Sequence, residues 1–332
     1  MKLYKKILIY LALALILIVL GYFFVGTAKP AENIKWGVDF SIGQAEDFGL
    51  NWKETFLAIL DDLRVKNLRV SAHWDLIEPK EGTYDFSDLD WMIGEAEKRN
   101  VEIILAMGMK TPRWPECHTP QWAEGLKQNE QQQKILYLEK EIILRYQKTQ
   151  NIKYWQVENE PFFPFGKCLM VSPAFVKEEV SLVKSLDLFK RPVVISDSGE
   201  GSLWFATAGI GDIVGITTYR RIWFKEIGIY FNFPLPPIFY SRRAQLIDKL
   251  FSKKVINVEL QAEPWCQTSL WQCTSEEQNK TMNLEQFKKN IEFARQTGID
   301  EFYFWGVEWW YWLKTVKQDD AIWQEASKII KG

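Results

Sequence analysis

The stretch Ile152-Lys153-Tyr154-Trp155-Gln156-Val157-Glu158-Asn159-Glu160-Pro161 joins an apolar, β-type run to a polar end. Residues 152–157 have the composition of a buried strand, and Pro161 stops it because proline cannot donate to a sheet. Two carboxylates and an amide are therefore carried to the carboxyl end of a strand. Acid–base chemistry needs such groups on rigid backbone, so this stretch predicts a functional site if another strand of the same sheet supplies a second carboxylate.

Strand-like runs and amphipathic helical patterns alternate from residue 35 onward. The predicted strands are 35–40, 67–71, 101–107, 152–159, 192–197, 213–218, 254–259 and 301–305. Helical patterns lie near 52–63, 88–99, 131–149, 173–188, 202–208, 243–252, 284–297 and 319–330. Eight strand–helix units favour an α/β fold of the (β/α)8 TIM-barrel type over an open doubly wound sheet. The first strand is followed by no glycine-rich phosphate loop, which also weighs against a dinucleotide-binding fold.

Composition narrows the class of protein further. With 332 residues, 47% of them hydrophobic, the chain can bury the core of one large domain. A net charge of −2 and the lack of a basic stripe argue against a nucleic-acid partner. Aromatic residues make up 15% of the chain, which suits either core packing or contact with the flat apolar faces of sugars.

The N-terminus predicts a membrane segment. Three lysines within the first six residues precede an uncharged apolar run from Ile7 to Val25, close to the roughly 20 residues that a membrane helix needs. We expect a signal-anchor helix in residues 1–27, a tether in 28–34 and the barrel in 35–332. The lysines place the barrel outside the cytoplasm as a single-pass membrane protein. Gly26-Thr27-Ala28 keeps open the alternative of a secreted chain released by signal cleavage.

Four cysteines fit an oxidising compartment. Cys117 and Cys168 lie in loops after consecutive strands, and Cys266 and Cys273 share one loop, so these two pairs are the expected disulfides. Cys117-His118 raises the alternative of a metal site. With two histidines in the chain and no CxxC spacing, we expect no metal and no cofactor.

The second carboxylate ends the seventh predicted strand, in Lys254-Val255-Ile256-Asn257-Val258-Glu259-Leu260-Gln261. Strands 4 and 7 both end at the mouth of a barrel, so Glu160 and Glu259 can converge there. A retaining glycosidase needs two carboxyl groups about 5–5.5 Å apart, one as acid/base and one as nucleophile. Either glutamate alone would be read as a surface residue at a strand end, whereas the pair predicts catalysis.

Several stretches resemble clan A glycoside hydrolases, the retaining (β/α)8 enzymes that include cellulases, xylanases and β-galactosidases. Asn159-Glu160-Pro161 resembles the clan's strand-4 motif, and Val258-Glu259-Leu260-Gln261 resembles its strand-7 motif. The resemblance implies that Glu160 is the acid/base, that Glu259 is the nucleophile, and that Asn159 binds the sugar 2-hydroxyl. It also implies three supporting residues, which are Arg69 near the nucleophile, Tyr219 hydrogen-bonded to it and Trp305 as the floor of the −1 subsite.

A further stretch, residues 74–90, resembles the region from strand 2 to helix 2 of family 42 β-galactosidase-type barrels. Altogether the resemblance spans roughly residues 35 to 330. The loop after strand 6 and the segment from Glu259 to Trp271 depart from the pattern of these families. The resemblance therefore implies the reaction class and leaves the sugar open.

The surroundings of the two glutamates predict different ionisation. Arg69 and Tyr219 would stabilise a carboxylate at Glu259 by charge and hydrogen bonding. Glu160 lies among Trp155, Phe162 and Phe163, where desolvation and a nearby anion should raise its pKa. One glutamate would then be ionised for attack while the other carries the proton for the leaving group.

Other residues near the strand ends have two interpretations each. Glu263 is an alternative nucleophile, although it lies beyond the strand. Glu158 lies two residues before Glu160, so on a regular strand both side chains point to the same side, into the barrel. There Glu158 could pair with Arg69 or another cation, or it could bind substrate. Trp74, and with less support His73, could line the −1 subsite. Five further tryptophans follow strands 7 and 8 as stacking platforms or as packing, namely Trp265, Trp271, Trp309, Trp310 and Trp312.

The segment 220–240 is rich in aromatic residues and contains three prolines. It could be a packed lid, a wall of the substrate cleft, or a surface that touches a membrane or an amphiphilic glycan. We favour the packed lid, because proline fixes the loop and aromatic side chains would pack it.

The sequence thus predicts a membrane-anchored, extracytoplasmic, retaining β-glycosidase that cleaves an oligo- or polysaccharide by double displacement. Its expected partners are a carbohydrate substrate and the membrane, and the oligomeric state is left open. A transglycosylase with the same residues and a non-catalytic glycan-binding barrel are the alternatives.

Overall fold

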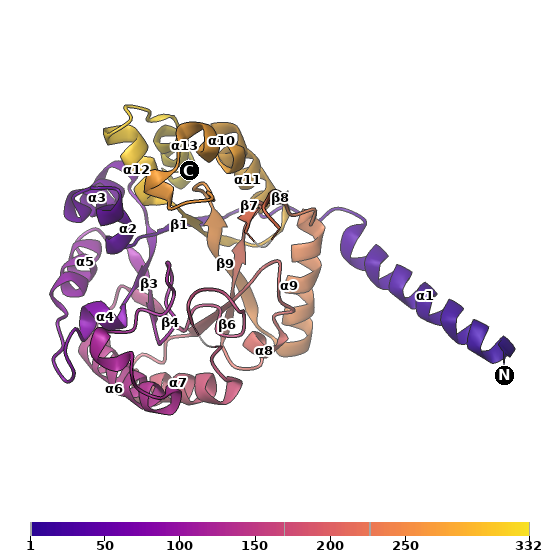
Figure 1. Cartoon of the computed structure of the whole chain (residues 1–332), viewed down its shortest axis with the longest axis horizontal. Helices are drawn as coiled ribbons and strands as arrows, with labels where there is room; N and C mark the ends of the chain where they lie inside the picture. The colour runs from indigo at the N-terminus through magenta and orange to yellow at the C-terminus, as the bar shows by residue number, and fades with distance from the viewer. Residues whose placement is uncertain (1, 169, 226, 332) are drawn as a thin grey trace.

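Eight parallel strands close into a barrel in the computed structural model, which describes residues 2–168, 170–225 and 227–331 (Figure 1). Their order around the barrel is β1-β10-β9-β6-β5-β4-β3-β2. The predicted (β/α)8 barrel is therefore confirmed. The strands are β1 (Lys35–Asp39), β2 (Asn67–Ser71), β3 (Glu102–Met107), β4 (Ile152–Val157), β5 (Val193–Asp197), β6 (Ile213–Thr218), β9 (Lys254–Gln261) and β10 (Glu301–Trp305).

Helices cover the outside of the barrel and α1 projects away from it (Figure 1). The α-helices are α1 (Lys2–Phe24), α2 (Ile42–Asp47), α3 (Trp52–Ala58), α4 (Trp74–Ile77), α5 (Ser87–Glu97), α6 (Gln128–Tyr146), α7 (Pro173–Leu186), α8 (Phe205–Ala208), α9 (Pro237–Phe251), α10 (Ser275–Thr281), α11 (Leu284–Gln296), α12 (Val307–Thr315) and α13 (Ala321–Lys331). Shorter turns are the π-helical η1 (Ile59–Leu63) and the 3₁₀ turns η2 (Gln121–Ala123) and η3 (Leu270–Gln272).

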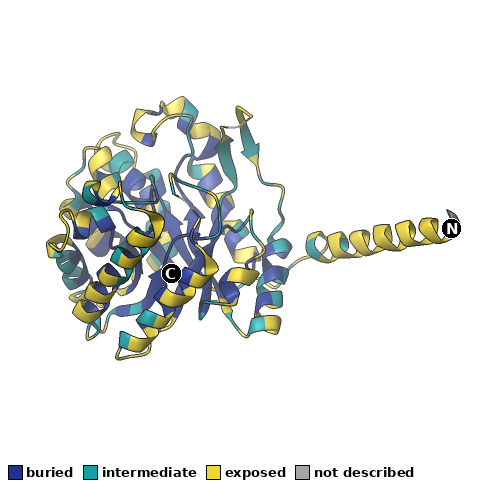
Figure 2. Cartoon of the chain, turned by 60° about the horizontal axis from the view of Figure 1, so that its bottom comes forward, coloured by how far each residue is buried: buried dark blue, intermediate teal, exposed yellow. Residues whose placement is uncertain are grey.

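Side chains along each strand alternate between two buried layers, one inside the barrel and one under the helices. Figure 2 shows the buried residues as the dark centre of the molecule. Side chains that point into the barrel form a small apolar cluster that includes Ile104, Tyr154 and Tyr303. Side chains that point outward join the larger core under the helices. Gly37 makes room inside the barrel, because a Cβ there would lie 2.6 Å from the Tyr303 ring.

A β-bulge interrupts β9 just before Glu259. Ile216 pairs with Asn257 and Thr217 pairs with Glu259, so Val258 is an extra residue on β9. The register against β10 shifts over the same part of β9. A bulge re-aims the side chain that follows it. Val258 belongs to the cluster inside the barrel, and without the bulge strict alternation would turn Glu259 outward.

The tether predicted in residues 28–34 lies along the barrel. The backbone N–H of Ala31 donates to Arg295 O at 3.1 Å, at the end of α11. Closer to the anchor, the rings of Phe23 and Phe24 contact Phe239 of α9 at centroid distances of 6.1 and 5.4 Å. The N-terminal helix is thus attached to the side of the barrel at α9.

The aromatic segment 220–240 forms a two-stranded antiparallel hairpin, β7 (Arg221–Phe224) and β8 (Ile229–Asn232), before α9 begins. Aromatic rings pack against one another along it, as in the pair Trp223 and Tyr230 at 5.0 Å. The side chain of Gln261 fastens its base by accepting from the backbone N–H groups of Arg220 and Arg221. The packing agrees with the favoured interpretation, while the role of a lid stays a prediction.

Candidate active site

The strand-4 motif leaves the sheet in a strained turn. β4 ends at Val157, two residues earlier than predicted, and both Glu158 and Glu160 have positive φ, at 59° and 43°. Such backbone is costly for residues other than glycine and is found most often at functional sites. Neighbouring strands hold the turn, because Asn159 N donates to Lys110 O at 2.6 Å and Glu160 N donates to Ser196 Oγ at 2.9 Å.

Arg69 of β2 joins the predicted site residues inside the mouth of the barrel. Its Nη1 donates to Glu259 Oε1 at 2.8 Å and to Asp39 Oδ1 at 2.9 Å. Its Nη2 donates to Asn159 Oδ1 at 2.8 Å, and its Nε donates to Gln156 Oε1 at 2.8 Å. One buried guanidinium therefore fixes groups from β1, β4 and β9.

Glu259 accepts hydrogen bonds at both carboxylate oxygens. Arg69 donates to Oε1, and the Tyr219 hydroxyl donates to Oε2 at 2.8 Å. Burial and the Glu259 anion raise the pKa of Tyr219 well above its usual range, so the phenol keeps the proton that it donates. These contacts orient an anionic carboxylate toward the mouth of the barrel.

Glu160 lies in a different environment close to Glu259. Thr217, the register partner of Glu259, donates its hydroxyl to Glu160 Oε1 at 3.0 Å. Burial, followed by electrostatic repulsion from Glu259 and Glu116, raises the pKa of Glu160 well above its usual value. The structure thus places both predicted catalytic glutamates next to Thr217, and their surroundings favour the protonated form of Glu160.

Glu116 is a member of the site that sequence reasoning missed. Its Oε2 accepts from Asn159 Nδ2 at 3.0 Å and lies 3.8 Å from Lys110 Nζ. Burial raises the pKa of Glu116 to about 8. The only signal in the sequence is a loop after β3 that is dense in charged residues and proline, residues 110–117.

Two disulfides are present, Cys117–Cys168 and Cys266–Cys273, as predicted. The first joins the loop after β3 to the loop after β4. Lys110 reinforces this connection, because its Nζ donates to the backbone oxygens of Glu160 and Phe163 at 3.0 and 3.1 Å. The loop that carries Glu116 and the loop that carries Glu160 therefore form one unit.

Arg113 covers one face of Trp305, the predicted floor of the −1 subsite. Its guanidinium carbon lies 3.9 Å from the centre of the indole ring, which leaves Trp305 8% exposed. Glu263 and Glu308 hold the guanidinium from the other side. Glu263, the alternative nucleophile, is therefore paired with Arg113, and a sugar that stacked on this face of Trp305 would have to displace Arg113.

A small cavity of about 10 Å³ lies between Asp39, Arg69, Arg113 and Trp305. Among the residues that the structure describes, Asp39 Oδ2 and Glu263 Oε2 are buried without a hydrogen-bond partner. Free carboxylate oxygens at a mouth of this kind can accept from sugar hydroxyls or from water.

Trp74 does not line this mouth. Its side chain is fully buried, donates from Nε1 to Glu78 Oε2 at 2.9 Å, and packs edge-on against Trp122. Its predicted role in substrate binding is therefore wrong for this conformation, because no surface of the indole is left for a sugar. His73 contacts Thr111 Oγ1 at 2.8 Å and stacks on His118.

The later tryptophans divide into packing and possible platforms. Trp309 and Trp310 are buried and donate to Gln278 and to the backbone of Ala262. Trp265 is half-buried and lies edge-on to Tyr219 at 5.2 Å, next to the nucleophile's hydrogen-bond donor. It is the best placed of the five to meet a bound sugar.

Glu158 points outward, contrary to the prediction from strand parity. Because β4 ends at Val157, the next side chain turns toward the helices and accepts from Met109 N and Lys110 N at 2.8 and 2.7 Å. Its other neighbours are Glu179 of α7 and, beyond it, Glu139 of α6, all three fully buried. The expected partnership with Arg69 is therefore wrong, and Glu158 lies outside the mouth.

This row of glutamates predicts a loss of stability in alkali. Carboxyl oxygens can share a hydrogen bond only if one of them is protonated, and burial raises the pKa of all three groups. Their contribution is fully present below the unfolded pKa near 4.5 and is lost as the pH rises through the folded values. Glu179→Gln should therefore become more stable relative to wild type as the pH is raised.

The measurement is thermal unfolding at several pH values. Glu178→Gln is the matched control, because Glu178 is exposed on the same helix. Equal pH profiles for Glu179→Gln and Glu178→Gln would contradict proton sharing by the row.

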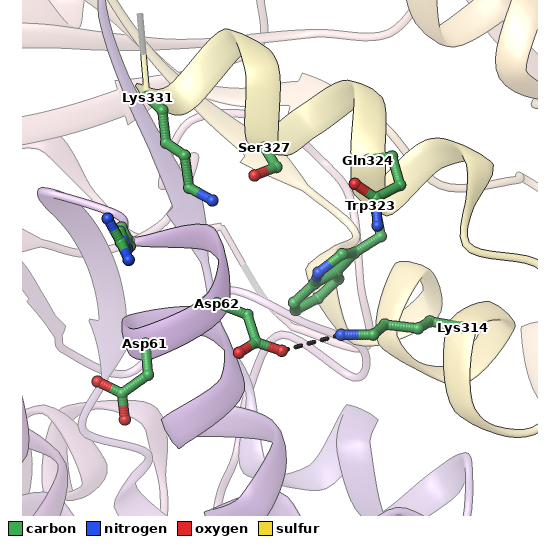
Figure 3. Close-up of a pocket in the computed structure, with 8 residues that line it drawn as sticks. Asp61, Asp62, Lys314, Trp323, Gln324, Ser327 and Lys331 are labelled. Carbon is green, nitrogen blue, oxygen red and sulfur yellow. Dashed lines mark hydrogen bonds and ion pairs between the residues drawn. The ribbon is translucent and has the colours of Figure 1, made fainter.

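A larger cavity, of about 300 Å³, opens elsewhere on the barrel between η1, α12 and α13 (Figure 3). Lys314 Nζ lies 2.9 Å from Asp62 Oδ2 there and sits over the ring of Trp323, which is buried. Two of the charged groups around this cavity, Asp62 and Lys314, are thus paired with one another, and it contains none of the predicted site residues.

Comparisons with known proteins support the same class of site. Residues 51–170 match the family model of glycoside hydrolase family 42, which is described as Beta-galactosidase. Beta-galactosidase LacA of Lactobacillus acidophilus is 26% identical over 106 residues, which are 26% of this chain and 16% of that protein. The chain thus matches only a small part of the length of this relative.

Solved structures match almost the whole barrel. Xylanase 10B from Thermotoga petrophila superposes with a TM-score of 0.54 and 15% identity, over 82% of each chain. An exo-β-1,4-mannosidase from an Opitutaceae bacterium gives a TM-score of 0.59 and 13% identity, over 86% of this chain and 54% of that one. The predicted resemblance to clan A glycoside hydrolases is confirmed by the family match and, for the fold, by these structures. The comparisons therefore show the barrel fold and, over residues 51–170, a similarity to family 42 glycoside hydrolases.

Proposed function

We propose that the chain is a retaining β-glycosidase that cleaves O-glycosidic bonds of an oligo- or polysaccharide by double displacement. The observation that carries the proposal is that Glu160 and Glu259 have different surroundings at the mouth of the barrel. Glu259 accepts hydrogen bonds from Arg69 and Tyr219, whereas burial and the nearby anion raise the pKa of Glu160. One group is arranged as a nucleophile and the other as an acid.

The geometry supports two steps. In the first, Glu160 gives its proton to the glycosidic oxygen while a Glu259 oxygen attacks the anomeric carbon, so that the aglycone leaves and a glycosyl ester forms. In the second, the Glu160 carboxylate takes a proton from water, and the water oxygen displaces Glu259. Asn159, held by Arg69 and Ser196, would donate from Nδ2 to the sugar 2-hydroxyl once Glu116 releases it.

The acid role of Glu160 is tested with two substrates. Glu160→Gln should lower turnover of an unactivated β-glycoside by about 10²–10⁴-fold, because general acid catalysis is lost. Formation of the glycosyl-enzyme from a dinitrophenyl glycoside should change far less, because that leaving group needs no proton. Burst kinetics on both substrates, after a screen of chromogenic β-glycosides for the sugar, gives the measurement.

Glu158→Gln is the control from the same motif, and it should retain most of the activity because Glu158 faces the helices. Normal turnover of the unactivated substrate by Glu160→Gln would show that the assignment is wrong. Product analysis with an added acceptor sugar separates hydrolysis from transglycosylation.

We also propose that α1 anchors the barrel to a membrane, with the barrel outside the cytoplasm. Tyr4–Phe24 form 21 residues of mean hydropathy 2.8, and no residue of the most apolar 18-residue window within them is buried. The lysine cluster before it supports the orientation. Secretion after cleavage near Ala28 is the alternative, and the N-terminal sequence of the mature protein distinguishes the two.

A further inference from the structure

Several large apolar side chains are exposed where α7 and α9 end and α8 begins. Asp212, just before β6, pairs with Lys184 of α7 at 2.7 Å and with Lys253, beyond α9, at 3.6 Å. The rings of Phe205 in α8 and Phe251 in α9 lie 6.0 Å apart. These contacts bring together the end of α7, the short helix α8 and the end of α9. The large exposed side chains there, called the α7–α9 patch below, are Leu188, Phe189, Leu203, Phe205 and Leu250.

The N-terminal anchor is fastened to the same side of the barrel. Tyr22, at the end of α1, lies 4.7 Å under the guanidinium of Arg242, and Arg242 Nη1 also contacts Gly21 O at 3.4 Å. Phe24 packs on Phe239, near the start of α9. In Figure 1, α1 leaves from the upper end of α9 and runs outward and down, to about the level of the lower end of α9. α9 thus carries the anchor near its beginning and the patch at its end.

We propose that the α7–α9 patch rests on the lipid bilayer that α1 spans, an inference that depends on the proposed anchor. Because ordered contacts at Phe239, Arg242 and Arg295 hold the N-terminal segment against the barrel, the domain is not free to swing away from the membrane. An apolar surface with flanking lysines is the composition of an interfacial membrane contact. Lys190 and Lys249 are exposed beside the patch and suit anionic headgroups.

The contact would fix the direction in which the active site opens. With both ends of α9 close to the bilayer, α9 lies along the surface, and the barrel strands that it packs against lie roughly along it as well. The mouth at the carboxyl ends of the strands then opens along the membrane plane. The proposed glycosidase would meet glycans that run along the cell surface.

Spin labels on the full chain in vesicles of neutral and anionic phospholipid test the proposal. All four cysteines are in disulfides, so an added cysteine is labelled alone. Labels at Leu203→Cys and Leu250→Cys should collide less with a water-soluble nickel chelate and more with oxygen. Val316→Cys is the matched control, because Val316 is an apolar residue that is also more than half exposed, and it follows α12, on the side away from α1 (Figure 1).

A label at Leu13→Cys, in the middle of α1, reports on the anchor itself. If this label is in the hydrocarbon while positions 203 and 250 match 316 in nickel accessibility, the patch does not contact lipid and the inference is overturned. If the label at 13 is in water, or the chain does not enter the vesicles, the anchor and the inference fail together. Neither result bears on catalysis by Glu160 and Glu259, which the burst kinetics measure separately.

Discussion

Glu259→Gly should lower kcat on glycoside substrates by on the order of 10⁶-fold, because a covalent nucleophile acts as a unit with its acid partner. Adding azide should restore turnover of an activated β-glycoside, since the small anion can occupy the space of the lost carboxylate. The product should be the α-glycosyl azide, because azide attacks from the side of Glu259. Nuclear magnetic resonance of the product gives the configuration.

The same experiment on the partner residue should give the opposite stereochemistry. In Glu160→Gln the glycosyl-enzyme still forms from an activated substrate, and azide then replaces water to give the β-glycosyl azide. The pair of products therefore assigns both roles without knowledge of the natural sugar.

Glu263→Gly is the control for the alternative nucleophile. Because Glu263 pairs with Arg113 and not with Tyr219, we expect no azide product from this variant. An α-glycosyl azide from Glu263→Gly, with none from Glu259→Gly, would transfer the nucleophile role to Glu263. Melting curves of each variant exclude loss of fold as the cause of lost activity.

The strand positions could be predicted because each buried strand is a short apolar run between turn signals. Glu160 and Glu259 could be found because they stand at the ends of two such runs. Arg69, Tyr219 and Trp305 followed from the resemblance alone. Their contacts in the site depend on the curvature of the barrel, which no local pattern encodes.

Predicting side-chain direction from strand alternation failed where the backbone is irregular. Glu158 was expected to point inward, yet β4 ends at Val157 and the side chain turns toward α6 and α7. At β9 the bulge at Val258 re-aims Glu259, so the side to which this residue points does not follow from alternation either. Trp74 was misplaced because an aromatic residue after a strand can as well pack under the next loop, and here it bonds Glu78.

The loop after β3 contributes residues to the site that could not be predicted from the sequence. Arg113 and Glu116 both have positive φ, so neither side chain follows from the course of the strand. They reach Trp305 and Asn159 only because contacts between loops close the turn. Long-range contacts of this kind can be seen only in the folded chain.

Arg69→Met should destabilise the barrel by about 3–5 kcal/mol, the usual result of breaking a buried ion pair on one side. Arg69 is buried and donates to Asp39, Gln156, Asn159 and Glu259, so the variant would leave two carboxylates buried without their cation. Urea unfolding of the full chain in detergent gives the free energy. Arg99→Met is the matched control, because Arg99 pairs with Asp61 and Glu95 at the surface. It should cost no more than about 1 kcal/mol.

A second substitution, at Asp39, shows whether stability is lost because a buried carboxylate has no cation beside it. Burial already raises the pKa of Asp39 well above its usual value against the opposing charge of Arg69. Without Arg69, the buried Asp39 carboxylate lowers the free energy of unfolding. Asp39→Asn should therefore recover part of the stability in the Arg69→Met background. In the wild-type background the same substitution should be destabilising or neutral. Additive losses from the two changes would instead mean that Arg69 stabilises the barrel through packing and not by compensating the charge of Asp39.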